Sequence, residues 1–199
     1  MTARARLRAS IRQQRTALSD AEHQLHADQL YQHLVPHKLF QRSRRIAGFI
    51  ANDGEIDPQP LLNHALERGY HCFLPVLNQL HGNRLWFAPF RDDTPLASNR
   101  YGIPEPPLFP PQPTPAWSID LVLTPLVAFD QLGGRIGMGG GFYDRTFNHP
   151  KRSLNRQRPF LLGLAHAFQQ VDRVELNPWD VMLDGIATEE GITLFQKPS

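Results

Sequence analysis

The sequence predicts an α/β fold of three layers, α/β/α, in which helices cover both faces of a largely parallel central sheet. Short apolar runs typical of buried strands alternate with helical patterns. One succession of strand, helix and strand has short loops and indicates a right-handed parallel crossover. A later strand runs into a glycine-rich loop and a helix start, an order that builds phosphate sites. The 199 residues suit a single domain, residues 1–199.

Composition argues against several classes of protein. A formal net charge of +2 disfavours a general nucleic-acid binder. No apolar run approaches the roughly 20 residues that cross a bilayer. The single cysteine, Cys72, allows no internal disulfide, which fits a reducing compartment. We therefore expect a cytoplasmic monomer that binds neither nucleic acid nor membrane.

The first segment, residues 3–18, has the pattern of a basic helix that packs on the domain. Leu7, Ile11 and Leu18 share an apolar face. A neighbouring face is cationic, with arginines at positions Arg4, Arg8, Arg12 and Arg15. This face is either solvated or an anion site. A targeting signal is disfavoured because no apolar segment follows.

A second helix is expected to follow immediately. Ser19 and Glu22 have the spacing of a capping box, in which each side chain bonds the backbone N–H of the other residue. The helix should run to about Val35, because Pro36 cannot continue it.

The crossover comes next in the chain. The run Arg45–Ala51 is typical of a buried strand, Pro58 opens a helix that Gly69 closes, and residues 71–77 form the next strand. Glu55 follows the first strand. Ligands of parallel sheets sit beyond the carboxyl ends of strands, so Glu55 is a candidate binding residue. Alternatively it only complements the positive end of the helix dipole.

Three further strands complete the predicted sheet. They fall at residues 84–88, near an edge, at 159–165 and near 185–188, with a polar turn at 177–180 before the last. The segment Pro104–Pro115 has seven prolines in twelve residues, so we expect an extended internal connection without regular structure. A domain linker or an SH3 ligand is the alternative for this segment.

The glycine-rich stretch Asp130–Arg145 is the main candidate site. It follows the apolar run Leu121–Phe129, predicted as one strand, and glycine occupies six of the nine positions from 133 to 141. Glycines let successive backbone N–H groups turn toward an anion, and a following helix start adds donors. Arg135 and Arg145 supply charge for the same anion, while Asp144 is a candidate metal ligand.

Two common glycine motifs are excluded. No glycine is followed by the Lys-Ser or Lys-Thr pair of a Walker A loop. The third glycine of a dinucleotide-binding Gly-x-Gly-x-x-Gly loop would fall at Phe142. A surface turn without ligand is disfavoured, since flexible linkers usually carry serine.

Together these segments resemble the 5-formyltetrahydrofolate cyclo-ligase family. Residues 134–145, Gly-Arg-Ile-Gly-Met-Gly-Gly-Gly-Phe-Tyr-Asp-Arg, are similar to its signature Gly-x-Arg-Leu-Gly-x-Gly-x-Gly-Tyr-Tyr-Asp-Arg. Further pieces in the same order are 17–19, 45–47, 102–106, 120–130, 163–169, 179–181 and 188–189. The resemblance implies a NagB/RpiA/CoA-transferase-like fold. It also implies conversion of 5-formyltetrahydrofolate to 5,10-methenyltetrahydrofolate with ATP and Mg²⁺, by phosphorylation of the formyl oxygen and attack by N10.

The resemblance also assigns roles to residues. It makes Arg135, Arg145 and Tyr143 catalytic, and Asp144 and Asp180 the Mg²⁺ ligands. The implied ATP-binding residues are Arg4, Arg8, Gly134, Arg135, Ile136, Gly137, Met138, Gly139, Gly140, Gly141, Phe142 and Tyr143. The implied folate-binding residues are Ile50, Glu55, Tyr101, Met138, Gly139, Gly140, Gly141 and Phe142.

Three positions depart from the family pattern. Arg4 stands where lysine is common, Phe142 replaces a tyrosine, and Gly140 stands where many members have a lysine that reaches the γ-phosphate. We expect Arg135 and Arg145 to substitute for that lysine. One alternative function is a nucleotide-dependent kinase or transferase with another acceptor, against which Glu55 argues. Another is a nucleic-acid or regulatory binding module, which the low net charge disfavours.

Overall fold

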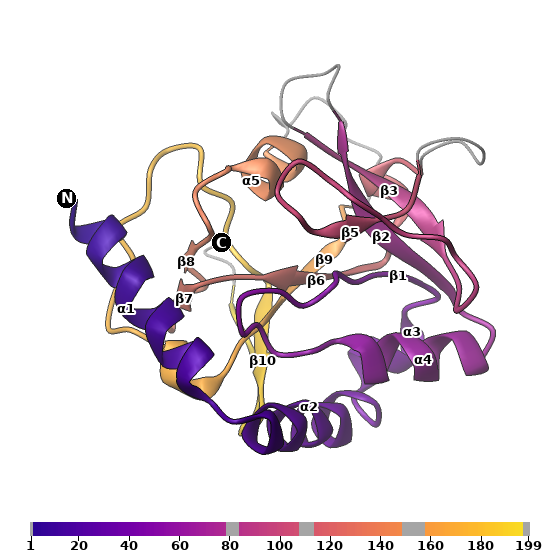
Figure 1. Ribbon diagram of the computed structural model, residues 1–199, viewed down its shortest axis with the longest axis horizontal. Coiled ribbons are helices and arrows are strands. Elements are labelled where there is room, and N and C mark those ends of the chain that lie inside the picture. Colours follow the sequence, from indigo (N-terminus) through magenta and orange to yellow (C-terminus); the bar gives the residue numbers. More distant parts are fainter. Residues whose placement is uncertain (1, 79–83, 108–113, 149–157, 197–199) are drawn as a thin grey trace.

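A computed structural model of the protein describes residues 2–78, 84–107, 114–148 and 158–196. A seven-stranded sheet forms its centre, in the order β11-β10-β9-β6-β1-β2-β3 (Figure 1). Its strands are β1 (Arg45–Ala47), β2 (His71–Asn78), β3 (Arg84–Phe90), β6 (Leu121–Pro125), β9 (Phe160–Leu164), β10 (Gly185–Thr188) and β11 (Gly191–Leu194).

The sheet is largely parallel, as predicted. Strands β10, β9, β6, β1 and β2 pair in parallel, while β3 and β11 pair antiparallel at the two edges. The chain moves from β1 outward to β3, then returns to β6 on the other side of β1. The order of strands therefore reverses between β1 and β6, and such a switch point leaves a crevice at the carboxyl ends of the strands.

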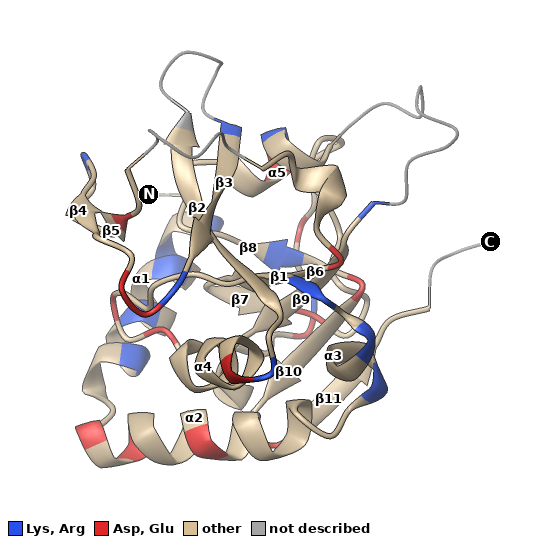
Figure 2. Cartoon of the chain, turned by 90° about the vertical axis from the view of Figure 1, so that its right-hand side faces the viewer, with Lys and Arg blue, Asp and Glu red and all other residues tan. Residues whose placement is uncertain are grey.

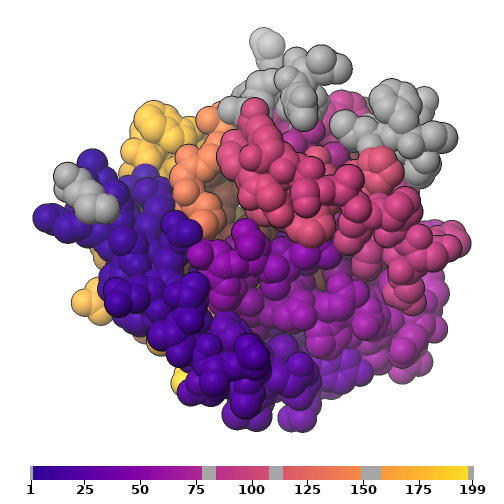
Figure 3. All heavy atoms as spheres, viewed as in Figure 1, coloured from indigo at the N-terminus to yellow at the C-terminus, as the bar shows by residue number. Residues whose placement is uncertain are grey.

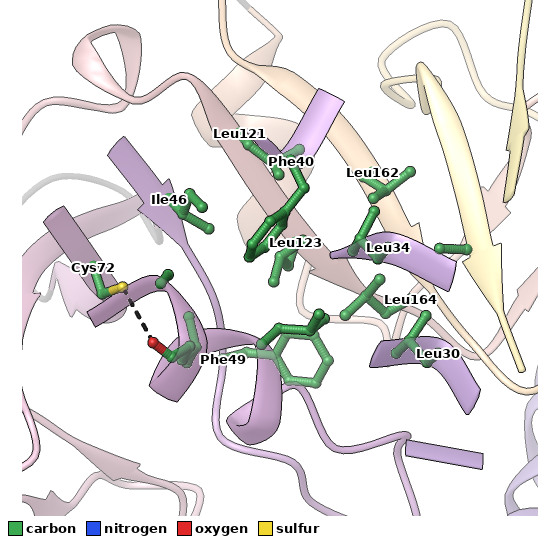
Figure 4. Close-up of a cluster of buried hydrophobic side chains, with 14 of the residues drawn as sticks. Leu30, Leu34, Phe40, Ile46, Phe49, Cys72, Leu121, Leu123, Leu162 and Leu164 are labelled. Carbon is green, nitrogen blue, oxygen red and sulfur yellow. Dashed lines mark hydrogen bonds between the residues drawn. The ribbon is translucent and has the colours of Figure 1, made fainter. Parts of the chain in front are cut away.

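Three helices cover one face of the sheet: α2 (Asp20–Leu34), α3 (Lys38–Arg42) and α4 (Gln59–Glu67). Leu30 and Leu34 of α2 and Phe40 of α3 pack with alternate strand residues such as Leu121 and Leu123 in a buried cluster (Figure 4). The predicted capping box forms at the start of α2, where Ser19 accepts from Glu22 N and the Glu22 carboxylate accepts from Ser19 N. Cys72 is buried in this cluster, and burial raises the pKa of its thiol to about 12.

The second face of the sheet is covered by α5 (Phe142–Phe147) and the 3₁₀ turn Ala116–Ser118. Ala47, Phe73, Phe87 and Val122 point to this side and pack with aromatic residues of α5. The three-layer α/β/α arrangement is thus present, and the central strands are buried on both sides under different helices.

Helix α1 (Ala3–Ala17) packs on a small separate sheet. Strands β7 (Ala128–Phe129) and β8 (Arg135–Ile136) form this antiparallel pair. Ile11 is buried against Ala128 and Ile136, and Leu7 is partly buried beside them. The predicted apolar face of the N-terminal helix is confirmed for Leu7 and Ile11, whereas Leu18 is the extended C-cap residue and lies outside this cluster. No helix among the described residues is long and apolar enough to span a membrane.

Two predicted strands were too long. The first ends at Ala47, and the run 121–129 divides, since β6 ends at Pro125 and β7 joins the other sheet. Side chains replace the strand hydrogen bonds where the chain leaves the main sheet. The Leu126 carbonyl accepts from Arg15 Nη1 (3.2 Å) and Gln169 Nε2 (3.0 Å). A continuous apolar run does not reveal such a change of partner.

The prediction of no regular structure in the proline segment was wrong at its two described ends. The short strand β5 (Pro104–Glu105) pairs with β4 (Ala97–Ser98), and Thr114 bridges to Phe87 of β3. Residues 108–113 lie outside the described residues. The helix α3 and the strand β11 were not predicted, because five and four residues are too short for a clear periodic pattern.

Candidate active site

A cavity of about 550 Å³ lies at the carboxyl ends of β1, β6 and β2. In Figure 3 the surface is hollowed where the segments near residues 50, 100 and 140 meet. The predicted site residues in its wall are Ile50, Glu55, Tyr101, Arg135, Gly137, Met138, Gly140, Gly141, Phe142, Tyr143 and Asp144. These eleven residues therefore line one cavity at the crevice of the switch point.

The glycine loop supplies one end of the cavity. The backbone N–H groups of residues 137–141 meet no acceptor within the part of the chain that the structure describes. Gly139 and Gly141 have φ angles of 107° and 64°, which side chains with a Cβ rarely adopt. These unpaired donors make the loop a suitable cradle for an anion.

The turn before the loop is fixed by a buried carboxylate. Asp130 accepts from the backbone N–H groups of Leu132 (2.9 Å), Gly134 (2.8 Å) and Val174 (2.9 Å). A Cβ at Gly134 would lie 2.7 Å from the Asp130 carboxylate, so glycine is required for this close approach. The loop is therefore held at its base while its N–H groups remain unpaired.

Arg135 and Asp144 form the charged pair of the site. The Arg135 guanidinium is buried and donates to Asp144 Oδ1 at 2.8 Å, and also to the Val181 carbonyl. Val181 N donates back to the same Asp144 oxygen at 3.0 Å. Because Asp180 precedes Val181, these bonds bring both predicted metal ligands to the same end of the cavity.

The first turns of α1 bring two arginines to the glycine loop. Arg8 Nε donates to the Gly137 carbonyl at 2.8 Å, and Arg4 Nη2 donates to Asp180 Oδ2 at 3.1 Å. Figure 2 shows the basic side of α1 near β8. Burial, and then the charge of Arg4, lower the pKa of Arg8 below its ordinary value. The Nε of Arg4 is buried without an acceptor among the described residues, as expected where an anion can bind.

Two further arginines of the helix, Arg12 and Arg15, have a structural role. Arg12 Nε and Arg15 Nη2 each lie 2.6 Å from Asp53 Oδ2. These contacts lower the pKa of Asp53, chiefly through the hydrogen bond from Arg12. Arg15 is fully buried, so a solvated face is wrong for this residue. Asp53 has a φ of 55°, an uncommon conformation that the two arginines stabilise.

Glu55 lies on the turn after β1, and Tyr143 of α5 is close enough to interact electrostatically with both Glu55 and Arg135. The Glu55 carboxylate accepts from Asn52 N at 3.1 Å, and burial raises its pKa to about 7 despite Arg15 Nη1 at 4.0 Å. Burial, and then the charge of Glu55, raise the pKa of Tyr143. Glu55 is thus a carboxylate whose environment favours a partner that donates hydrogen bonds.

Outside the glycine loop, the sequence identified only Ile50, Glu55 and Tyr101 of the cavity wall. Tyr101 stands at the rim, half exposed, with its ring edge-on to Phe142 at 6.0 Å between centroids. Strand ends contribute apolar residues, which from the sequence were indistinguishable from core. The remaining wall residues are Arg12, Phe49, Asn52, Asp53, Leu74, Pro75, Leu77, Leu85, Asn99, Ile103, Pro104, Glu105 and Pro125.

The comparisons with known proteins identify the family. Residues 1–189 match the 5-formyltetrahydrofolate cyclo-ligase family. The chain belongs to this family. It is 35% identical over 178 residues to the 5-formyltetrahydrofolate cyclo-ligase of Escherichia coli strain K12, covering 89% of this chain and 96% of that one. It is 34% identical over 181 residues to the Haemophilus influenzae cyclo-ligase, covering 90% and 94%.

Solved structures agree with the membership in the cyclo-ligase family. The Aquifex aeolicus 5,10-methenyltetrahydrofolate synthetase superposes with a TM-score of 0.80 at 26% identity, covering 100% of this chain and 95% of that one. The Mycoplasma pneumoniae synthetase gives a TM-score of 0.71 at 25% identity, covering 94% and 99%. The predicted fold class is therefore confirmed.

Two departures from the cyclo-ligase signature are spatially coupled. A Cβ at Gly140 would lie 2.6 Å from the ring of Phe142, so a side chain at 140 requires that ring to move. Arg145 Nη1 donates to the Gly140 carbonyl at 2.6 Å. Arg145 does not line the cavity, but it holds the loop at the position where many cyclo-ligases have lysine. Six other predicted site residues do not line the cavity either: Gly134, Ile136, Gly139, Arg4, Arg8 and Asp180.

The residues present fit a hard divalent cation. Arg135 and Val181 use only Oδ1 of Asp144, and Arg4 and Asn177 use only Oδ2 of Asp180. Each carboxylate keeps an oxygen without a hydrogen bond to the described residues. Mg²⁺ is usually bound by one or two carboxylates together with substrate phosphates. The two carboxylates are therefore adequate ligands for Mg²⁺ when the phosphates of a nucleotide and water supply the remaining ligands.

Proposed function

We propose that this protein converts 5-formyltetrahydrofolate to 5,10-methenyltetrahydrofolate with ATP, releasing ADP and phosphate. The main observation is that one cavity joins a loop of unpaired N–H groups to a buried carboxylate, Glu55. Such a cavity has a place for a triphosphate beside a place for a pterin. Family membership makes this reaction, rather than a kinase reaction on another acceptor, the expected one.

The triphosphate binds at the glycine loop in this proposal. The N–H groups of residues 137–141 contact phosphate oxygens, and Arg4 and Arg8 add charge from α1. The contribution of α5 to anion binding is small, because this helix has six residues and fewer than two turns. The loop and the arginines therefore provide most of the binding free energy.

Arg135 faces the transferred phosphoryl group. Its guanidinium has five N–H groups, and its hydrogen bonds to Asp144 and the Val181 carbonyl fix its position while leaving other N–H groups for phosphate oxygens. Phosphoryl transfer depends mainly on positioning and neutralisation of charge. Asp144 and Asp180 would hold Mg²⁺, which supplies further neutralisation of the phosphates when bound. Arg145 positions the loop through the Gly140 carbonyl.

The folate binds at the other end of the cavity. Glu55 accepts hydrogen bonds from pterin N–H groups, with Ile50 packed beside it and Tyr101 and Phe142 at the rim. Tyr143, held next to Glu55, lies between the two substrates. This arrangement presents the formyl oxygen to the γ-phosphate. N10 then attacks the activated carbon, and phosphate leaves with the former formyl oxygen.

Domain organisation, cellular location and oligomeric state are also proposed. We propose a single domain, residues 1–199, that acts as a cytoplasmic monomer with ATP and the folate as its partners. The buried and reduced Cys72 and the net charge of +2 support this assignment over a secreted protein or a nucleic-acid binder.

The test is an absorbance assay for the methenyl product. We expect absorbance to rise only when purified protein, ATP, Mg²⁺ and 5-formyltetrahydrofolate are all present. Omission of each component in turn is the control. No rise in the complete mixture contradicts the proposal, and release of ADP without methenyl product indicates a different acceptor.

A further inference from the structure

A cluster of two histidines and one glutamate lies apart from the cavity. His26 belongs to α2, His166 follows β9, and Glu189 follows β10. One ligand atom from each of them lies within 4.8 Å of the other two. Helix α2, which carries His26, packs against β10 and β11 (Figure 1), while His166 and Glu189 lie in the short connections that follow β9 and β10.

The hydrogen bonds of His166 orient it as metal-bound histidines are oriented. Its Nε2 lies 3.1 Å from the Gly54 carbonyl, an acceptor, so Nε2 carries the proton and Nδ1 keeps its lone pair. Nδ1 points to His26 Nδ1 at 2.8 Å. Burial lowers the pKa of His166 to about 4, which agrees with a neutral ring. A ring that donates one N–H to a backbone carbonyl and presents the other nitrogen is typical of metal ligation.

Glu189 is the third member of the cluster. Both of its oxygens accept from Ala167 N at 3.0 Å, and Oε1 lies 3.7 Å from His26 Nδ1. No lysine or arginine among the described residues forms an ion pair with this partly buried carboxylate. Its charge is therefore available to a cation between the two rings.

The distances suit a small transition-metal ion. Ligands at about 2.0–2.1 Å from a tetrahedral Zn²⁺ lie roughly 3.3–3.4 Å from one another. The Nδ1 atoms of His26 and His166, now 2.8 Å apart, would separate slightly as the metal replaces the proton between them. Ligand atoms that are up to 4.8 Å apart would move closer together to reach the metal. Imidazole nitrogens favour zinc-like ions over Mg²⁺.

We propose that His26, His166 and Glu189 form a binding site for a divalent transition metal of the zinc class, distinct from the active site. Three protein ligands leave a fourth position for water, and the His23 ring lies edge-on to His166 with its centroid 5.5 Å from that of His166. The site does not depend on the proposed enzymatic function.

The site is connected to the substrate-binding turn. The Gly54 carbonyl that accepts from His166 lies between Asp53 and Glu55. A Cβ at Gly54 would lie 2.9 Å from the Arg15 backbone, so this turn is tightly packed. A metal that fixes the His166 ring therefore fixes one side of the turn that carries Glu55.

The test uses full-length protein treated with a chelator and then titrated with Co²⁺ as the probe. We expect one equivalent to bind with visible ligand-field bands of nitrogen and oxygen coordination, and Zn²⁺ to displace it. Asp144→Asn serves as the background, so that metal at the active site is not counted. His26→Ala and Glu189→Gln should each weaken binding at least tenfold.

His71→Ala is the matched control, because His71 is an exposed histidine of β2 away from both sites. Its metal affinity should equal that of the background protein. Glu189→Gln keeps an acceptor for Ala167 N, so it remains informative if His26→Ala does not fold, which circular dichroism reports. Absence of a bound equivalent, or affinity unchanged in both cluster variants, overturns the proposal and leaves a hydrogen-bonded histidine pair.

Discussion

The two ends of the active-site cavity are built differently. At the phosphate end, charged side chains from α1, β8, α5 and the 177–181 turn contact one another, as in the pairs Arg135–Asp144 and Arg4–Asp180. At the proposed folate end, Glu55 is a buried carboxylate 4.0 Å from Arg15, next to the ion pairs that Asp53 makes with Arg12 and Arg15, and apolar strand ends line the wall beside it. Ion pairs therefore set the electrostatics of the first end, whereas burial is the main cause of the raised pKa of Glu55 at the second.

This difference predicts which kinetic constant each end controls. Charges at the phosphate end act most strongly where negative charge moves during phosphoryl transfer, so their loss should lower kcat. A buried acceptor at the folate end contributes to ground-state and transition-state binding alike, so its loss should raise KM for the folate. The variants below test this division, from the largest expected effect to the smallest.

Asp144→Asn should have the largest effect. The amide keeps an acceptor for Arg135 and Val181 but removes the negative charge that would hold Mg²⁺. We expect kcat to fall on the order of a hundredfold, with the dissociation constant of the folate unchanged. Steady-state kinetics and fluorescence titration with folate measure the two quantities. An equal loss of folate binding would show that the two ends are not separate.

Glu55→Gln should act on the folate alone. Hydrogen bonds to a charged acceptor contribute about 1.5–3 kcal/mol, so KM for the folate should rise roughly 10- to 150-fold, with KM for ATP unchanged. The effect should depend on pH. With a pKa of about 7, Glu55 is mostly protonated at pH 6 and mostly ionised at pH 8.

Wild-type KM for the folate should therefore fall by up to about tenfold from pH 6 to pH 8, because only the ionised carboxylate accepts with both oxygens. The glutamine variant lacks this titration and serves as the control. A wild-type profile that matches that of the variant would contradict Glu55 as the acceptor.

Arg8→Ala should have the smallest effect. It removes a cation that contacts Gly137 O and faces the proposed triphosphate, so ATP affinity should weaken by about tenfold. Arg6→Ala, an exposed arginine of the same helix, is the matched control. Calorimetric titration with ATP compares the two. Equal ATP affinities of the two variants would show that Arg8 has only a structural role, like that of Arg15.

The sequence by itself determined the features that depend on local backbone chemistry. The capping box at Ser19, the order of the longer strands and helices and the glycine loop were predicted, because each follows from a few adjacent residues. The resemblance to the cyclo-ligase signature also came from one contiguous stretch. These features specify the fold class and the location of the anion cradle.

Only the tertiary structure decided which distant groups contact one another. It brought Arg4 to Asp180, buried Arg15 against Asp53, and placed Phe142 where a side chain at Gly140 would lie. It also added a wall of strand ends that the sequence could not distinguish from core. Such contacts depend on packing between elements far apart in the chain, and no local pattern encodes that packing.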